Sequence, residues 1–71
     1  MELTFGTLVK INDPAQNARD LTAIVIAHDL ASNKVFYRIV TDNYIGISTQ
    51  RTNRWNCTVI GKYDGYIDLR L

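Results

Sequence analysis

The sequence predicts an all-β fold: a small barrel of five or six short strands with one short helical turn near residues 14–20. Short runs of β-branched and aromatic residues, typical of strands, fill most of the chain. Asn, Asp, Gly and Pro separate these runs, which indicates tight turns. Because 71 residues are too few for two full sheets, curling one sheet into a barrel is the economical way to hide its edges.

Length and composition predict one small globular domain, residues 1–71. With 46% hydrophobic and 21% charged residues, the chain lies in the globular range rather than the disordered one. A chain of this size buries only ~60% of the surface that its unfolded form exposes, so a small free energy of unfolding is expected. The sequence lacks the ~18 uninterrupted apolar residues that a membrane-spanning helix needs.

Cysteine content and the first residues bear on the compartment. Cys57 is the single cysteine, which excludes an internal disulfide framework and a multi-cysteine zinc site. The opening MELTFGTLVK carries an early glutamate and has no cleavable apolar run, unlike a secretory signal. We therefore expect a reducing compartment and a cytoplasmic protein.

The N-terminal half is expected to hold two strands separated by a capped turn. Residues 5–11, FGTLVKI, form the first strand and end at a turn signal. Asp13 is the expected cap, Pro14 the first helical position and Gln16 the capping-box partner, so residues 14–20 form one or two helical turns. Three consecutive β-branched residues in the run LTAIVIAH, residues 21–28, predict a strand buried on both sides.

Two hairpins are expected in the C-terminal half. Residues 34–41 and 44–49 flank Asp42-Asn43, and a two-residue turn there pairs Thr41 with Tyr44. Residues 58–63 and 66–71 flank Asp64-Gly65, a strong turn signal that pairs Tyr63 with Tyr66. Gly46 and Gly61 are the expected positions of strand bends or bulges.

The first hairpin has two half-apolar faces. One face is mostly aliphatic and is the expected core side: Phe36, Arg38, Val40, Ile45, Ile47 and Thr49. The opposite face presents Tyr37, Ile39 and Tyr44. Two explanations stay open for this second face: barrel curvature or the helical turn covers it, or it is a surface for a ligand or another subunit, since tyrosines combine a large contact area with a polar group.

The segment TQRTNRWNC, residues 49–57, joins the two hairpins. It carries Arg51, Arg54 and the only tryptophan, Trp55, among small polar residues. Trp55 either covers the small core from one end or points outward, where it forms with the arginines the composition of an interaction hot spot. The same composition suits stacking on an unpaired base while arginines hold phosphates.

The order of the expected strands is similar to that of SH3-like barrels, including the KOW and Tudor types. The resemblance covers most of the chain and depends on FGTLVKI, the polar excursion DPAQNARDL, TAIVIAHD, VFYRIVTDNYIGIS and a closing strand pair. The sequence lacks the glycine-rich pattern that follows the first strand in KOW domains. It also lacks the ALYDY-like segment of SH3 peptide-binding domains, so the ligand of neither class carries over.

Catalytic and metal-binding patterns are sparse in this sequence, and we expect no enzyme, metal or cofactor. His28 and Cys57 are the only candidates for a base and a nucleophile. His28 at the end of an apolar strand is more typical of a histidine bonded to a neighbour, and Cys57 of a small buried apolar residue. The carboxylates are scattered without metal-ligand spacing.

Two functions remain after these exclusions. The first is a non-enzymatic protein–protein interaction module, acting as an accessory subunit, adaptor or inhibitor. Self-association into a homodimer is also predicted for it. Its expected partner-binding residues are Tyr37, Ile39, Tyr44, Arg51, Arg54 and Trp55. The alternative is a KOW- or Tudor-like nucleic-acid-binding protein using Arg38, Arg51, Arg54, Trp55 and Lys62. The net charge of only +1 gives such binding no general support.

Overall fold

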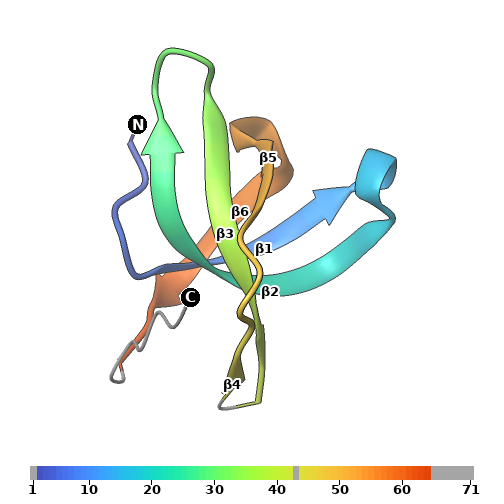
Figure 1. Ribbon diagram of the computed structural model, residues 1–71, viewed down its shortest axis with the longest axis vertical. Helices are drawn as coiled ribbons and strands as arrows, with labels where there is room; N and C mark the ends of the chain where they lie inside the picture. Colours follow the sequence, from blue (N-terminus) through green and yellow to red (C-terminus); the bar gives the residue numbers. More distant parts are fainter. Residues whose placement is uncertain (1, 43, 65–71) are drawn as a thin grey trace.

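The computed structural model describes residues 2–42 and 44–64, and this part of the chain forms one antiparallel sheet (Figure 1). The all-β prediction is confirmed. The elements in chain order are β1 (Thr7–Asp13), the 3-10 helix η1 (Pro14–Gln16), β2 (Ala18–Asp29), β3 (Lys34–Thr41), β4 (Tyr44–Ile45), β5 (Gln50–Asn53), the 3-10 helix η2 (Arg54–Asn56) and β6 (Cys57–Lys62).

The strands lie in the order β4–β3–β2–β1–β6, and β5 pairs with a different stretch of β3. The chain therefore returns at its last described strand to pair with its first, which places β6 beside β1. Figure 1 shows β2 bending strongly along its length, so that its two ends belong to different sides of the curved sheet. The strand has a bulge at residue 26 in this bend. Val25 pairs with Tyr37 and Ala27 pairs with the adjacent Phe36, so residue 26 has no partner on β3.

The turn between β1 and β2 follows the expected capping chemistry. The Asp13 carboxylate accepts a hydrogen bond from Ala15 N–H at 3.1 Å, and Pro14 occupies the first helical turn. The Gln16 side chain donates to the same carboxylate at 2.6 Å. Asn17 then adopts φ 56 and ends the helix after one turn. The helical turn is confirmed but shorter than expected, since residues 18–20 already belong to β2.

β2 is buried on both faces, as the run of β-branched residues predicts. Ala23 and Val25 point into the core, while the alternate residue Ile24 lies on the outer face. All three side chains are fully buried. The central position of β2 between β1 and β3 explains why both of its faces are covered.

The β3–β4 turn has the predicted register. Thr41 pairs with Tyr44 and Val40 with Ile45, and Asp42 adopts φ 54. The partner strand is then interrupted. Two residues of β3 lie opposite four residues, 46–49, before Tyr37 pairs with Gln50. The single strand expected over residues 44–49 is therefore wrong: two short strands, β4 and β5, flank a wide bulge.

Gly46 begins this bulge, and alanine there is expected to destabilise the fold by about 1 kcal/mol. An added Cβ would lie 3.3 Å from the Ile39 carbonyl oxygen, which already accepts the Gly46 N–H at 2.7 Å. The strands cannot separate without weakening that hydrogen bond. Urea unfolding followed by circular dichroism measures the change. Ser48→Ala, at an exposed position of the same bulge, is the control; equal unfolding midpoints for the two variants would contradict the argument.

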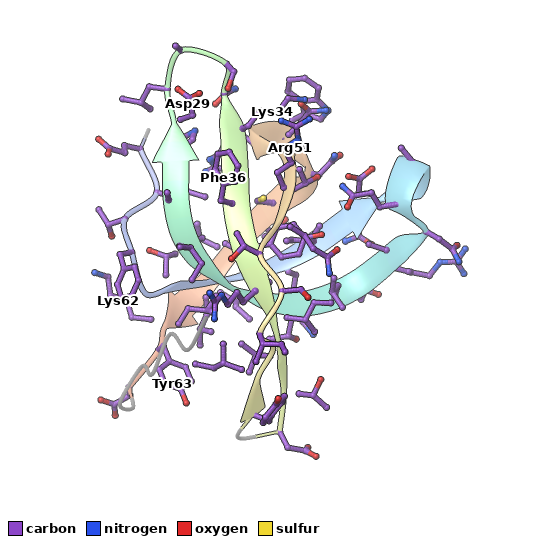
Figure 2. All side chains as sticks on the ribbon, viewed as in Figure 1. Asp29, Lys34, Phe36, Arg51, Lys62 and Tyr63 are labelled. Carbon is purple, nitrogen blue, oxygen red and sulfur yellow. The ribbon has the colours of Figure 1, made fainter. Side chains whose placement is uncertain are left out.

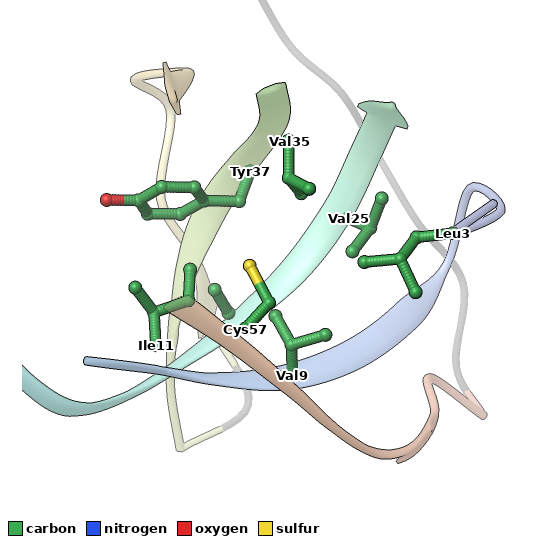
Figure 3. Packing of buried hydrophobic residues seen from close by; sticks show 8 residues of the cluster. Leu3, Val9, Ile11, Val25, Val35, Tyr37 and Cys57 are labelled. Carbon is green, nitrogen blue, oxygen red and sulfur yellow. The ribbon is translucent and has the colours of Figure 1, made fainter. Parts of the chain in front are cut away.

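The core lies on the inner face of the curved sheet (Figure 3). Its buried residues come from the N-terminal segment and four strands: Leu3, Val9, Ile11, Ala23, Val25, Val35, Tyr37 and Cys57. The prediction that the Phe36 face of β3 is the core side is wrong. Val25 and Ala23, the residues paired with Tyr37 and Ile39, are small enough to leave room for the tyrosine ring on that face.

The sheet curls as expected but does not close into a barrel within the described residues. β5 and β6 end the sheet on opposite sides, and they are joined through η2 rather than by a ladder of hydrogen bonds. The hairpin expected around Asp64-Gly65, with Tyr66 paired to Tyr63, lies outside the described residues.

Candidate functional site

The residues expected to bind a partner do not form one surface. Tyr37 is fully buried in the core, and Ile39 is partly buried against it, so the sheet itself covers the tyrosine face. Tyr44 is 64% exposed but lies on β4, at the far end of the molecule from β5 and η2 in Figure 1. Arg51 and Trp55 remain, both exposed and four residues apart on β5 and η2.

Trp55 is 74% exposed on η2, so the outward arrangement is the one observed. Short hydrogen bonds fix the backbone on either side of it. Arg54 N–H donates to the Asn33 carbonyl at 3.0 Å, and Cys57 N–H donates to the Arg54 carbonyl. The Arg54 guanidinium donates to the Cys57 carbonyl at 3.0 Å. A large aromatic side chain is thus held in solvent by a constrained turn.

Arg51 and Phe36 are direct neighbours on the outer face of the sheet. They form a cross-strand pair between β5 and β3, and Figure 2 shows their side chains beside Lys34 at this end of the molecule. An open groove of about 440 Å³ runs past them, lined by Gln16, Phe36, Thr49, Gln50 and Arg51. We call the groove together with the exposed Trp55 the β5 surface.

Arg51 is the free cation of the β5 surface. Within residues 2–42 and 44–64 its guanidinium makes no hydrogen bond or ion pair; only its backbone carbonyl is used, by the Gln16 side chain at 2.7 Å. The other cations nearby are held by polar groups: Lys34 donates to the Asn53 side chain, Arg54 to a backbone carbonyl, and Arg38 to the Thr49 hydroxyl. Arg51 is therefore the arginine best placed to bind a group from outside.

The basic residues of the nucleic-acid hypothesis are dispersed. Arg38 is only 5% exposed, and the Arg54 guanidinium is engaged with the backbone. Figure 2 shows Lys62 on the opposite side of the molecule from Arg51. A phosphate-binding groove needs several cations along one path. Of the three arginines in that set, only Arg51 has a guanidinium without a hydrogen-bond partner among the described residues.

A cluster of buried polar side chains lies on the inner side of β5, behind the β5 surface. The sequence did not predict this cluster. The Thr52 hydroxyl donates to the Asp13 carboxylate at 2.7 Å and accepts from the Asn56 side chain at 3.0 Å. The Thr52 hydrogen bond is the main reason that the pKa of Asp13 lies below its ordinary value, and bonds from Gln16 and Ala15 lower it further against the effect of burial. These bonds join β1 and η1 to β5 and η2.

His28 and Cys57 do not form a catalytic pair. The His28 Nδ1 accepts from Leu3 N–H at 3.0 Å, and its Nε2 lies 2.9 Å from the Asn33 side-chain oxygen. Both ring nitrogens are thus occupied, as expected for a histidine bonded to neighbours. Cys57 is buried, and burial raises the pKa of its thiol, which disfavours the thiolate needed for nucleophilic attack.

Comparisons with other proteins do not assign this site. No protein-family model, curated protein or solved structure matches the chain. Across the described residues, no group of three or more His, Cys, Asp or Glu side chains is placed to hold a metal ion. The two helices in the same part of the chain have three residues each, far short of the length that crosses a membrane.

Proposed function

We propose that this protein is a non-enzymatic protein–protein interaction module that docks its partner on the β5 surface. The observation that carries the proposal is Trp55, 74% exposed on a turn that hydrogen bonds hold in place. A tryptophan buries a large area on binding, and a fixed backbone reduces the entropy lost when the complex forms. Arg51, four residues earlier on β5, adds an exposed charged group, and tryptophan and arginine are among the residues enriched in hot spots.

The strand order supports a small SH3-like barrel as the scaffold for this role. In the described part, the chain runs through consecutive antiparallel strands, and β6 returns to pair with β1 after a 3-10 turn. Scaffolds of this size serve many functions, so the fold alone does not select one. On a molecule this small, the most direct activity is to cover part of a partner's surface, as an accessory subunit, adaptor or inhibitor does.

A protein partner is favoured over a nucleic acid by the distribution of charge. Lys34, Arg38 and Arg54, the cations near Arg51, are already hydrogen-bonded, Lys62 lies on the opposite side of the molecule in Figure 2, and the net charge of the chain is only +1. Affinity for phosphates grows with the number of phosphates neutralised. A surface of one tryptophan, one half-buried phenylalanine and one free arginine has instead the aromatic and arginine content of a protein interface.

Replacing Trp55 with alanine is expected to weaken partner binding by about thirtyfold, the ~2 kcal/mol typical of a hot spot. The melting temperature should change little, because the side chain is largely in solvent. Wild-type protein immobilised on beads captures the partner from a native lysate treated with nuclease, and the affinity of the purified partner is then measured by calorimetry for each variant.

Ile47→Ala is the matched control, because Ile47 is a similarly exposed apolar residue, 68% exposed, that belongs neither to η2 nor to the lining of the groove. It should retain full affinity. Equal losses for the two variants would indicate a general effect of surface hydrophobicity and contradict the proposal. Capture that disappears after nuclease treatment would point to nucleic acid as the ligand.

A further inference from the structure

We propose that the groove beside β5 binds a carboxylate side chain in an acidic segment of the partner, with Arg51 as the group that pairs with it. This inference rests on the proposed function, because it names the chemistry of the partner at the same surface. The argument starts from the polar groups that line the groove and from the partners they already have.

Three consecutive residues present hydrogen-bond donors to the groove. Arg38 Nε donates to the Thr49 hydroxyl oxygen at 3.1 Å, so the hydroxyl hydrogen is left to donate elsewhere. The Tyr37 hydroxyl donates to the Gln50 side-chain oxygen at 3.5 Å, which leaves the Gln50 amide nitrogen without a partner among the described residues. Next along the strand is the unpaired guanidinium of Arg51.

No carboxylate lines this groove among the described residues. The Asp13 carboxylate, which receives the Gln16 side chain, is turned inward and accepts from Thr52, Gln16 and Ala15. The Asp13 carboxylate is therefore already stabilised by three hydrogen-bond donors within the protein. A positive guanidinium with neighbouring neutral donors and no competing acid is complementary to an anion, and a carboxylate matches the two parallel N–H groups of arginine.

The remaining lining groups favour a peptide over a phosphodiester chain. The Gln16 amide nitrogen donates to the Asp13 carboxylate and to the Arg51 carbonyl, so the amide oxygen is left to accept a peptide N–H. The half-buried ring of Phe36 gives the groove an apolar wall. A segment in which an acidic residue neighbours an apolar one satisfies all these groups. A phosphate backbone has no N–H donor and would meet a single free cation.

The test uses the full-length, ¹⁵N-labelled protein and a defined probe, an acetylated and amidated pentapeptide of alternating glutamate and leucine. Titration should shift the Arg51 Nε–H, the Gln50 side-chain amide and the Trp55 indole resonances. The counterpart with glutamine in place of glutamate removes only the charge and should bind much more weakly. Added salt should lower the affinity of the glutamate peptide for the protein, because the ion pair with Arg51 is solvent-exposed and is screened by salt.

Arg51→Gln should reduce affinity for the glutamate peptide by about tenfold, the loss of one charge-assisted contact. Arg19→Gln is the matched control: it removes the same charge from an exposed position on β2 and should leave affinity unchanged. Equal binding of the two peptides, or an unchanged affinity in Arg51→Gln, would overturn the inference. Tighter binding of oligothymidylate through the same resonances would overturn it as well.

The two proposals fail in different ways. If the Trp55→Ala variant no longer binds the captured partner while the Arg51→Gln variant still binds it, the β5 surface is an interface but the assignment of a carboxylate to the groove is wrong. If no protein is captured by the wild type while the glutamate peptide binds through Arg51, the groove binds carboxylates and the docking function is wrong.

Discussion

Replacing Tyr37 with alanine is expected to remove about 3–5 kcal/mol of the free energy of unfolding, a large share of the total. Tyr37 is fully buried among Val35, Ile11 and other core residues, and truncating a buried aromatic side chain costs about 3–5 kcal/mol. A domain of this length is expected to have a total free energy of unfolding of only roughly 4–11 kcal/mol, at ~0.05–0.15 kcal/mol per residue. Circular dichroism and urea unfolding measure the loss.

Tyr37→Phe separates the ring from its hydroxyl. The hydroxyl makes one long hydrogen bond, 3.5 Å to Gln50, so the phenylalanine variant should stay folded with a small loss of stability. Tyr44→Ala, which truncates a tyrosine that is 64% exposed, should melt close to the wild type. Equal melting temperatures for Tyr37→Ala and Tyr44→Ala would show that the Tyr37 ring does not stabilise the core.

Replacing Thr52 with valine is expected to lower the melting temperature at neutral pH by several degrees. Valine keeps the volume of threonine but removes the hydroxyl that donates to Asp13 and accepts from Asn56. Both partners then lose a hydrogen bond in a place where Thr52 is only 3% exposed. Thr58→Val, on the exposed face of β6, is the control and should change the melting temperature little.

The effect of Thr52→Val should depend on pH. The pKa of Asp13 in the folded protein lies below its ordinary value of 3.8, so the folded state binds this proton less readily than the unfolded state. The stabilisation is therefore complete above the unfolded value and is lost as the pH falls through the folded pKa. Melting temperatures of the two proteins should converge between neutral pH and about pH 2. A constant difference over that range would contradict the role of the charged Asp13.

Local chemistry in the sequence was enough to predict the turns. Asp13, Pro14 and Gln16 form the cap of η1 because all three interactions lie within four residues. Asp42 permits the tight turn that pairs Thr41 with Tyr44. In each case the determining contacts join residues close in the chain, where the effects of side-chain type on the backbone are well defined.

Long-range partners decided what the sequence did not predict. Both faces of β3 are partly apolar, and the core side was chosen by the small residues of β2 that lie opposite Tyr37 and Ile39. The bond between Asp13 and Thr52 joins residues 39 positions apart. The bulge begins at Gly46, where the sequence predicts a bend or bulge, but its extent over residues 46–49 and the return of pairing at Gln50 were not predicted.

The candidate site was predicted in part. Arg51 and Trp55 stand out because they interrupt a run of small polar residues, and both are exposed. The groove between Arg51 and η1 was not predicted, since Gln16 reaches it from a distant part of the chain. Tyr37 and Arg38 were expected at binding surfaces but are buried, because the curvature of the sheet encloses both faces of β3 at its centre.

The incomplete closure of the sheet gives residues 50–57 a double role. This segment carries the proposed docking groups, Arg51 and Trp55, on its outside, while its inner side chains, Thr52 and Cys57, connect it to β1 through Asp13 and Ile11. A partner bound to this segment would hold β5 and β6 in place, the two strands that no ladder of backbone hydrogen bonds joins to each other. On the proposed function, affinity and conformational stability are thus thermodynamically linked in one short stretch, and a bound partner should raise the melting temperature of the fold.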